Sequence, residues 1–143
     1  MRKNRSTQLS EHFIIRSLRC KQGGTEVFSF FMRGSDILDV ADISRIQRDT
    51  SGSLEGFQRK EIKEHIKGIV EYLNQGDVIF PNAIILAVNR EVVFKQARGR
   101  DPEGAFNHAQ IGTLFIPKRS LGKKCAWIVD GQQRAIALTQ TKD

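Results

Sequence analysis

The most regular pattern of apolar and polar positions in this chain lies between residues 59 and 75. Apolar side chains recur there at spacings of three and four residues, which places them on one face of a helix. They are Ile62, Ile66, Ile69, Val70 and Leu73. The pattern therefore predicts an amphipathic helix over 59–75 with a buried apolar stripe and with Gly76 as its C-cap.

Shorter apolar runs on both sides of this helix predict β-strands. They span residues 12–20, 26–32, 82–88 and 111–116. The first two runs flank Gln22-Gly23-Gly24, which is typical of a hairpin turn. The run 82–88 is apolar enough for a buried strand, and residues 91–95 are expected to pair with it across Asn89-Arg90.

A strand, a sharp turn and the start of a helix are predicted near the end of the chain. The run 124–129, which is apolar after Lys124, leads into Asp130-Gly131-Gln132-Gln133-Arg134, and residues 135–138 are apolar again. Gly131 lets a ligand approach the backbone closely, and the first amides of a helix attract anions. Arg134 adds a planar group of donors that suits phosphate oxygens. The turn is therefore a candidate phosphate site.

The same five residues also fit a purely structural interpretation. Asp130 is a good N-cap residue, and Gln133 stands where a capping box takes Glu or Gln. The turn differs from a Walker loop, because no Gly-Lys-Ser/Thr follows, and from the three-glycine dinucleotide fingerprint. The motif alone leaves phosphate binding and helix capping open.

Three further segments complete the predicted fold. Residues 1–10 are polar and are expected to form a flexible tail, whereas Ser35 caps a short helix over 36–41. Residues 44–57 are expected to form a loop. A hairpin, helices, several strands and a last helix follow one another, and this order favours an α+β domain with a mixed sheet. With 143 residues, one domain over 1–143 is expected.

The charge of the chain favours a polyanionic partner. The formal net charge is +7 and the isoelectric point is about 9.8. Arg98 and Arg100 lie in a predicted loop over 96–110, and a denser basic group surrounds Gly122. This group, the candidate DNA-binding set, consists of Lys118, Arg119, Lys123 and Lys124. Solvation of exposed turns is the alternative explanation for these charges.

Other chemistry is sparse in this sequence. Cys20 and Cys125 fit no zinc or CxxC spacing, and the three histidines are scattered, so these residues predict no metal site. No apolar run reaches membrane-spanning length, and no signal-peptide core follows the basic start. The chain is therefore expected to be cytoplasmic and to have no membrane partner.

Two stretches resemble a known family. Trp127-Ile128-Val129-Asp130-Gly131-Gln132-Gln133-Arg134 resembles the signature of DGQHR-domain proteins, which are related to the ParB/sulfiredoxin superfamily. Gly56-Phe57-Gln58-Arg59, a helix and then Phe80-Pro81-Asn82-Ala83-Ile84-Ile85-Leu86 are similar to the upstream element of that family. The resemblance covers most of the chain from about residue 44 onward. It implies a ParB/sulfiredoxin-like mixed sheet with flanking helices.

The resemblance also implies a site, since the corresponding turn of that superfamily binds nucleotide phosphates. ATP or another NTP with Mg²⁺ is the implied cofactor. The implied nucleotide-binding residues are Gly131, Gln132, Gln133 and Arg134. The implied catalytic residues are Asp130, Arg134, Gln58 and Arg59. An arginine beside a transferring phosphoryl group stabilises developing charge, and Asp130 is the candidate for holding Mg²⁺ or orienting water.

The position of Gln58 and Arg59 adds a physical argument for an anion. They are expected at the start of the helix over 59–75, where the positive charge of Arg59 opposes the helix dipole. A bound phosphate would remove this conflict. Arg59 is therefore expected near Arg134, with an anion between the two guanidinium groups.

Branches of this family differ in function. DpdB-type proteins, linked to insertion of 7-deazaguanine bases into DNA, resemble this chain in carrying Gln at position 133, whereas DndB-type regulators of DNA phosphorothioation usually have His there. A module of modification-dependent restriction enzymes usually shows Leu-Thr-Thr in place of Ala135-Ile136-Ala137. Family members are generally longer, so the chain is expected to be a fragment or a minimal module.

The expected function is a nucleotide-binding, ATP-hydrolysing component of a bacterial DNA-modification system of the deazaguanine type, in the context of phage defence. DNA and a partner DNA-modification enzyme are the expected partners. The alternatives are a DndB-like DNA-binding transcriptional regulator of phosphorothioation and an NTPase module of a restriction system. A protein-interaction module with a capped helix and no ligand is a further reading. Enzymatic activity and a homo-oligomeric state stay open.

Overall fold

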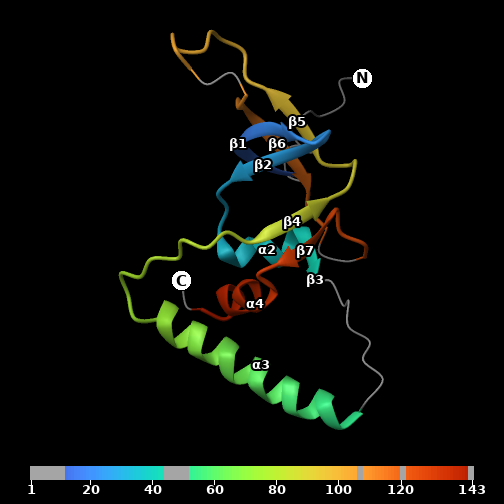
Figure 1. Ribbon diagram of the computed structural model, residues 1–143, viewed down its shortest axis with the longest axis vertical. Helices are drawn as coiled ribbons and strands as arrows, with labels where there is room; N and C mark the ends of the chain where they lie inside the picture. The colour runs from blue at the N-terminus through green and yellow to red at the C-terminus, as the bar shows by residue number, and fades with distance from the viewer. Residues whose placement is uncertain (1–11, 44–51, 106–107, 120–121, 142–143) are drawn as a thin grey trace, which may run out of the picture. The chain divides into compact units, whose positions relative to one another are not determined.

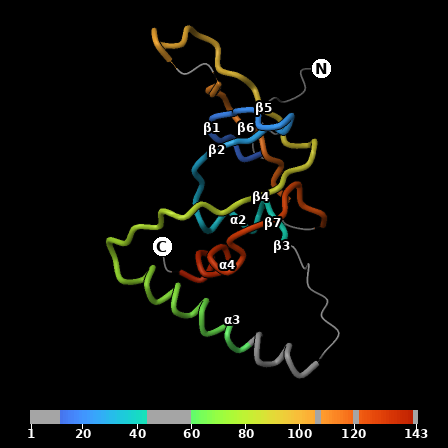
Figure 2. The backbone as a smooth tube through the Cα atoms, viewed as in Figure 1, coloured from blue at the N-terminus to red at the C-terminus, as the bar shows by residue number. Residues whose placement is uncertain are grey.

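The computed structural model describes residues 12–43, 52–105, 108–119 and 122–141, with side chains in the long helix from residue 60 onward. The expected tail 1–10 and the first part of the expected loop, 44–51, lie outside the described residues. The chain divides into two compact units, Met1–Met32 with Val88–Cys125 and Arg33–Ala87 with Ala126–Asp143. It passes between them three times, as the backbone path in Figure 2 shows.

The first unit is built on a four-stranded sheet in the order β2-β1-β6-β5 (Figure 1). Its strands are β1 His12–Gln22, β2 Thr25–Phe30, β5 Val93–Gln96 and β6 Gln110–Pro117. All three pairings are antiparallel. The predicted hairpin is confirmed, and Gly23 and Gly24 take positive φ angles of 53° and 83° in its turn.

One face of this sheet forms the core of the first unit. Leu114 and Ile116 of β6 are buried, and the buried Ser17 hydroxyl donates to the Ser29 carbonyl oxygen at 3.1 Å. The rings of Phe28 and Phe94 lie 5.5 Å apart between their centroids. The buried side chains of β6, contact between two half-buried aromatic rings and a satisfied hydroxyl therefore hold this small core together.

The partner of β5 differs from the predicted one. Residues 91–95 were expected to pair with the strand over 82–88, but β5 pairs with β6, with Val93 opposite Phe115. Gly112 of β6 makes the close pairing feasible, because a Cβ at this position would collide with the Phe94 ring and the Lys95 carbonyl oxygen. The strand over 82–88 is also shorter than predicted, since β4 spans only Ile85–Val88.

The second unit combines a three-stranded sheet with helices. The sheet order is β3-β7-β4, with β3 Ala41–Ile43 running parallel to β7 Ala126–Asp130. The helices are η1 Gly34–Asp36, α2 Ile37–Val40, α3 Gly52–Leu73 and α4 Gln132–Gln140. The parallel β3–β7 pairing is non-local, because Ala41 lies opposite Ala126.

Small and branched side chains form the core of the second unit. Val40, Ala41 and Ile128 are fully buried, as are Ala135 and Ala137 of α4. The alanines let neighbouring elements approach α4 closely. α3 packs against α4, and the two helices lie side by side in Figures 1 and 2.

The α+β class predicted from the sequence is confirmed, but the strands form two sheets where one mixed sheet was expected. The expected helix over 36–41 is divided into η1 and α2, and neither has a side-chain cap, so capping by Ser35 is wrong. Residue 41 begins β3 instead of ending the helix. Gly76, with a φ of 101°, lies three residues after Leu73, where α3 ends, so the prediction of Gly76 as the C-cap is wrong.

The long helix begins earlier than predicted and is less buried. α3 starts at Gly52, so residues 52–57 are helical where a loop was expected. Its predicted apolar stripe is not fully buried, since Ile62 is 40% exposed and the other members are only half-buried. One side of α3 is therefore open to a ligand or a partner.

Candidate functional site

The turn between β7 and α4 has the geometry of an anion site. β7 ends at Asp130, and Gly131 adopts the left-handed conformation with φ 85° and ψ 27° at the N-cap of α4. The first hydrogen bond of the helix runs from the Ala135 amide to the Gly131 carbonyl oxygen at 2.9 Å. The amides of Gln133 and Arg134 consequently have no acceptor inside α4.

The expected capping box does not form. Gly131, not Asp130, occupies the N-cap, and no side chain caps the helix. Gln132 instead directs its side-chain nitrogen to the Ile128 carbonyl oxygen at 3.4 Å. The structural interpretation of the motif as a capped helix is therefore wrong in its details.

Arg134 connects the turn to the segment that leads into β4. Its Nη1 donates to the carbonyl oxygens of Asn82 at 3.0 Å and Ala83 at 2.9 Å, and its Nη2 lies 3.4 Å from Asp130 Oδ2. The Arg134 side chain is only 22% exposed, whereas that of Asp130 is 66% exposed. Arg134 is therefore largely shielded from solvent at the helix start, because backbone carbonyls hold its guanidinium.

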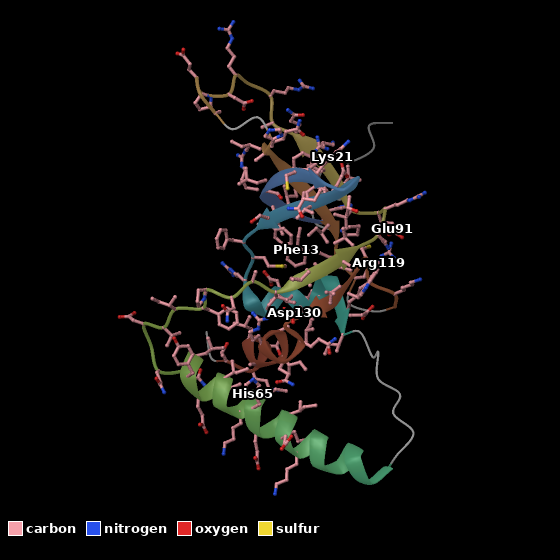
Figure 3. The ribbon with its side chains drawn as sticks, viewed as in Figure 1. Phe13, Lys21, His65, Glu91, Arg119 and Asp130 are labelled. Atoms are coloured by element: carbon pink, nitrogen blue, oxygen red, sulfur yellow. The ribbon has the colours of Figure 1, made fainter. Side chains whose placement is uncertain are left out.

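A cavity of about 900 Å³ lies beside this turn within the second unit. One wall is the whole turn, residues 129–134, and another is the segment 79–82. The third wall is one side of α3, which contributes Glu64, His65, Gly68, Ile69 and Tyr72. Figure 3 labels His65 on α3 and Asp130 on the turn. Ligand pockets typically enclose about 300–1,000 Å³, so a nucleotide-sized molecule fits.

The structure brings together some of the predicted site residues. Asp130 and the four implied nucleotide-binding residues 131–134 all line the cavity. Gln58 and Arg59 lie inside α3, as its seventh and eighth residues, and their side chains lie outside the described part of the chain. The argument that Arg59 opposes the dipole at a helix start is therefore wrong.

The α3 wall contains polar residues that the sequence motifs did not indicate. Glu64, His65 and Tyr72 line the cavity, and the Tyr72 hydroxyl donates to the Ile79 carbonyl oxygen at 3.1 Å. One sequence signal was available, because Gly68 interrupts an otherwise regular helical pattern.

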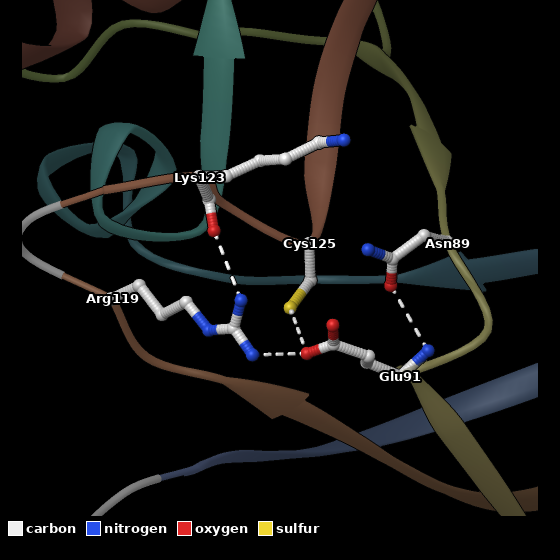
Figure 4. Close-up of polar contacts among 5 residues, drawn as sticks. All are labelled: Asn89, Glu91, Arg119, Lys123 and Cys125. Atoms are coloured by element: carbon white, nitrogen blue, oxygen red, sulfur yellow. Dashed lines mark hydrogen bonds and ion pairs between the residues drawn. The ribbon is translucent and has the colours of Figure 1, made fainter.

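The predicted DNA-binding set lies in the first unit and is partly occupied by internal contacts (Figure 4). Arg119 forms an ion pair with Glu91 and donates to the Lys123 carbonyl oxygen at 3.0 Å. The Lys118 ammonium lies 4.5 Å from the centroid of the Phe13 ring. Lys124 is half-buried, and the Lys123 side chain is exposed.

Glu91 also ties the basic turn to a buried thiol. The Cys125 Sγ donates to Glu91 Oε2 at 3.3 Å, and the Asn89 amide donates to the Cys125 carbonyl oxygen at 2.8 Å. Burial raises the pKa of the Cys125 thiol, the hydrogen bond to Glu91 raises it further, and the charge of Arg119 opposes this shift. Burial and the hydrogen bond to Glu91 therefore favour the protonated form of the Cys125 thiol.

The two units differ sharply in charge. The first unit contains 14 lysine and arginine residues and 5 acidic residues, a net charge of +9. The second unit contains 9 basic and 11 acidic residues, a net charge of −2. The positive charge of the chain is thus concentrated in the unit with the four-stranded sheet.

Within the described ranges, His, Cys, Asp and Glu form no group of three or more that is suited to a metal ion. No helix in the same ranges combines the length and apolar character needed to cross a membrane.

Comparison with protein families shows to which family the chain belongs. Residues 15–142 match the family described as "DndB: DNA-sulfur modification-associated". The chain belongs to the DndB family. Searches of curated proteins and of solved structures gave no match. The expected link to DNA modification is confirmed, and DndB is the branch that had been the alternative, despite Gln at position 133.

Proposed function

We propose that this DndB-family chain is a DNA-binding regulator of a DNA-phosphorothioation system and that its first unit contacts the DNA. The concentration of charge in that unit is the observation that carries the proposal. Lysine and arginine neutralise DNA phosphates and release counterions, which favours association. A net charge of +9 on one unit supplies this attraction, whereas the second unit, at −2, is repelled by a polyanion.

Within the first unit, exposed basic side chains outside the internal contacts are the best candidates for phosphate contacts. They are Arg16, Lys21, Arg90, Arg98, Arg100 and Lys123. Arg119 has a different role, because Glu91 neutralises it and its backbone contact shapes the turn. Phosphate contacts fix position on DNA and carry little sequence information, so this term is expected to be sequence-independent.

Nucleotide binding in the second unit is a second candidate function, and the cavity beside the turn favours it. The amides of Gln133 and Arg134 and the close approach allowed by Gly131 suit phosphate oxygens. Mg²⁺ is usually held by one or two carboxylates together with phosphate oxygens, and Asp130 supplies one exposed carboxylate. These residues fit Mg²⁺-ATP or another NTP, in which the metal would neutralise phosphate charge. The proposal is binding rather than hydrolysis.

DNA binding is tested by fluorescence anisotropy with a labelled duplex at 50–300 mM salt. Lys123→Ala is compared with Lys67→Ala, which removes an exposed lysine from α3 in the second unit. We expect Lys123→Ala to reduce the slope of log K against log salt by about 0.9 for one lost phosphate contact. Lys67→Ala should leave the slope unchanged. Absence of salt-dependent binding, or equal effects of both substitutions, would reject the assignment to the first unit.

Nucleotide binding is tested separately, by calorimetric titration of the full chain with ATP, CTP and GTP in the presence of Mg²⁺. Saturable heat with at least one nucleotide is expected. Titrations without heat for all three nucleotides, on protein whose circular dichroism shows a folded chain, would reject the second candidate function.

A further inference from the structure

The middle of α3 contains a glycine that packing does not explain. Gly68 lies within a 22-residue helix, where glycine is less favourable than alanine. A Cβ placed on Gly68 would meet no heavy atom within 4 Å, so no neighbour in the described chain requires its absence. Gly68 does line the cavity beside the phosphate turn. Its missing side chain therefore leaves space on the cavity side of the helix.

The neighbours of Gly68 on this wall have complementary chemistry. Glu64 and Tyr72 lie one helical turn before and after Gly68, and all three line the cavity. The Tyr72 ring is held in place by the hydrogen bond of its hydroxyl to Ile79. Along the helix the wall thus offers a carboxylate at Glu64, an open backbone position at Gly68 and an aromatic surface at Tyr72, in that order.

Two walls of the cavity, the turn and α3, suit the two ends of a nucleotide. The turn supplies backbone amides for phosphate, whereas Glu64 on α3 repels a phosphate group. A nucleobase is flat and uncharged, stacks on aromatic side chains and tolerates close contact with a helix backbone at glycine. A carboxylate accepts hydrogen bonds from an exocyclic amino group and repels a keto oxygen.

We propose that α3 carries the nucleoside subsite of this cavity, with the base lying over Gly68 beside Tyr72 and with Glu64 at its edge. The inference rests on the nucleotide binding proposed above. The proposed subsite selects bases with an exocyclic amino group, such as cytosine or adenine, over uracil. His65 lies next to Glu64 on the same wall, so its imidazole can form a hydrogen bond with the sugar or with the edge of the base.

The subsite is tested by comparing ATP with inorganic tripolyphosphate, both with Mg²⁺, on the full chain. Gly68→Leu should fill the subsite, so the Kd for ATP should rise at least tenfold while the Kd for tripolyphosphate stays within twofold. Lys67→Leu is the matched control, since its side chain is 76% exposed and does not line the cavity. It should leave both ligands unaffected. Gly68→Ala should raise the melting temperature and still weaken ATP binding, which separates ligand exclusion from misfolding.

Base selection gives a second readout. CTP carries an amino group at C4 of the pyrimidine where UTP carries a keto oxygen, and N3 is an acceptor in cytosine but an N–H donor in uracil. With Glu64 facing the C4 substituent, the wild-type chain should prefer CTP, and Glu64→Gln should remove most of that preference. If ATP and tripolyphosphate bind and Gly68→Leu changes neither, the subsite is wrong and the phosphate site stands. If neither ligand binds the wild-type chain, the proposed nucleotide binding fails first.

Discussion

The guanidinium of Arg134 donates a hydrogen bond of 2.9 Å to the carbonyl oxygen of Ala83, which lies 51 residues earlier in the chain. A second bond from the same nitrogen reaches the carbonyl oxygen of Asn82. The arginine of the phosphate motif thus connects α4 to the segment before β4. Its effect on ligand binding is therefore inseparable from its effect on the fold.

Arg134→Ala should destabilise the chain as well as weaken nucleotide binding. Hydrogen bonds from charged groups contribute about 1.5–3 kcal/mol, and the lower end applies here because water can reach the exposed residues Asn82 and Ala83. Urea denaturation of the variant measures the loss. Unchanged stability together with lost nucleotide binding would show that the carbonyl contacts are dispensable.

Gly131→Ala should be more damaging than Gly122→Ala. Both glycines have a φ of 85°, so both substitutions force alanine into the left-handed region at a cost of about 1–2 kcal/mol. A Cβ at Gly131 would also approach Arg134 Nη2 to 3.0 Å and Ile84 Cγ1 to 3.1 Å, whereas one at Gly122 meets nothing within 4 Å. The difference between the two variants in free energy of unfolding isolates this crowding. Equal losses would mean that the neighbours move aside freely.

Gly112→Ala should destabilise the sheet of the first unit. The new methyl group would collide with the Phe94 ring and the Lys95 carbonyl oxygen. Overpacking of this kind costs about 1–3 kcal/mol. A lower melting temperature is expected, and Phe94→Leu in the same chain should restore part of it, since leucine lacks the ring that faces the new methyl. A double variant no more stable than Gly112→Ala alone would refute the proposed collision.

Cys125 should make stability depend on pH in the alkaline range. Burial raises the pKa of its thiol above the ordinary value of 9.0, so the unfolded chain ionises first as the pH rises. The stabilising contribution is complete below 9.0 and is lost as the pH rises through the raised pKa of the folded state. The free energy of unfolding should therefore fall more steeply above pH 9 in the wild type than in Cys125→Ser. Parallel curves would exclude a raised pKa.

Local patterns predicted the turn well, because its determinants are close together in sequence. The apolar run before Asp130 and the glycine after it specify a strand and a left-handed turn whatever the rest of the chain does. Glycine tolerates the φ of 85° without strain, so the start of α4 is also determined by residues close together in sequence. The hairpin between β1 and β2 was predictable for the same reason.

Non-local contacts account for what the sequence did not predict. β3 has only three residues and exists through its pairing with β7, where Asp42 lies opposite Trp127. The hydrogen bonds of Arg134 to residues 82 and 83 also join segments that are far apart in sequence.

The early start of α3 was missed for a local reason. Gly52, Ser53 and Gly56 are poor helix formers, so the composition of this segment favours a loop.

The place of β7 at the centre of the β3-β7-β4 sheet sets an order of assembly. On the ribosome, both edge strands emerge before the strand that joins them, so neither has a partner in this sheet until residues 126–130 are synthesised. Long-range pairing of this kind slows folding and leaves strand edges exposed in the meantime. The second unit therefore completes its sheet only after almost the whole described chain has been made. Late synthesis thus delays the phosphate turn and its cavity together.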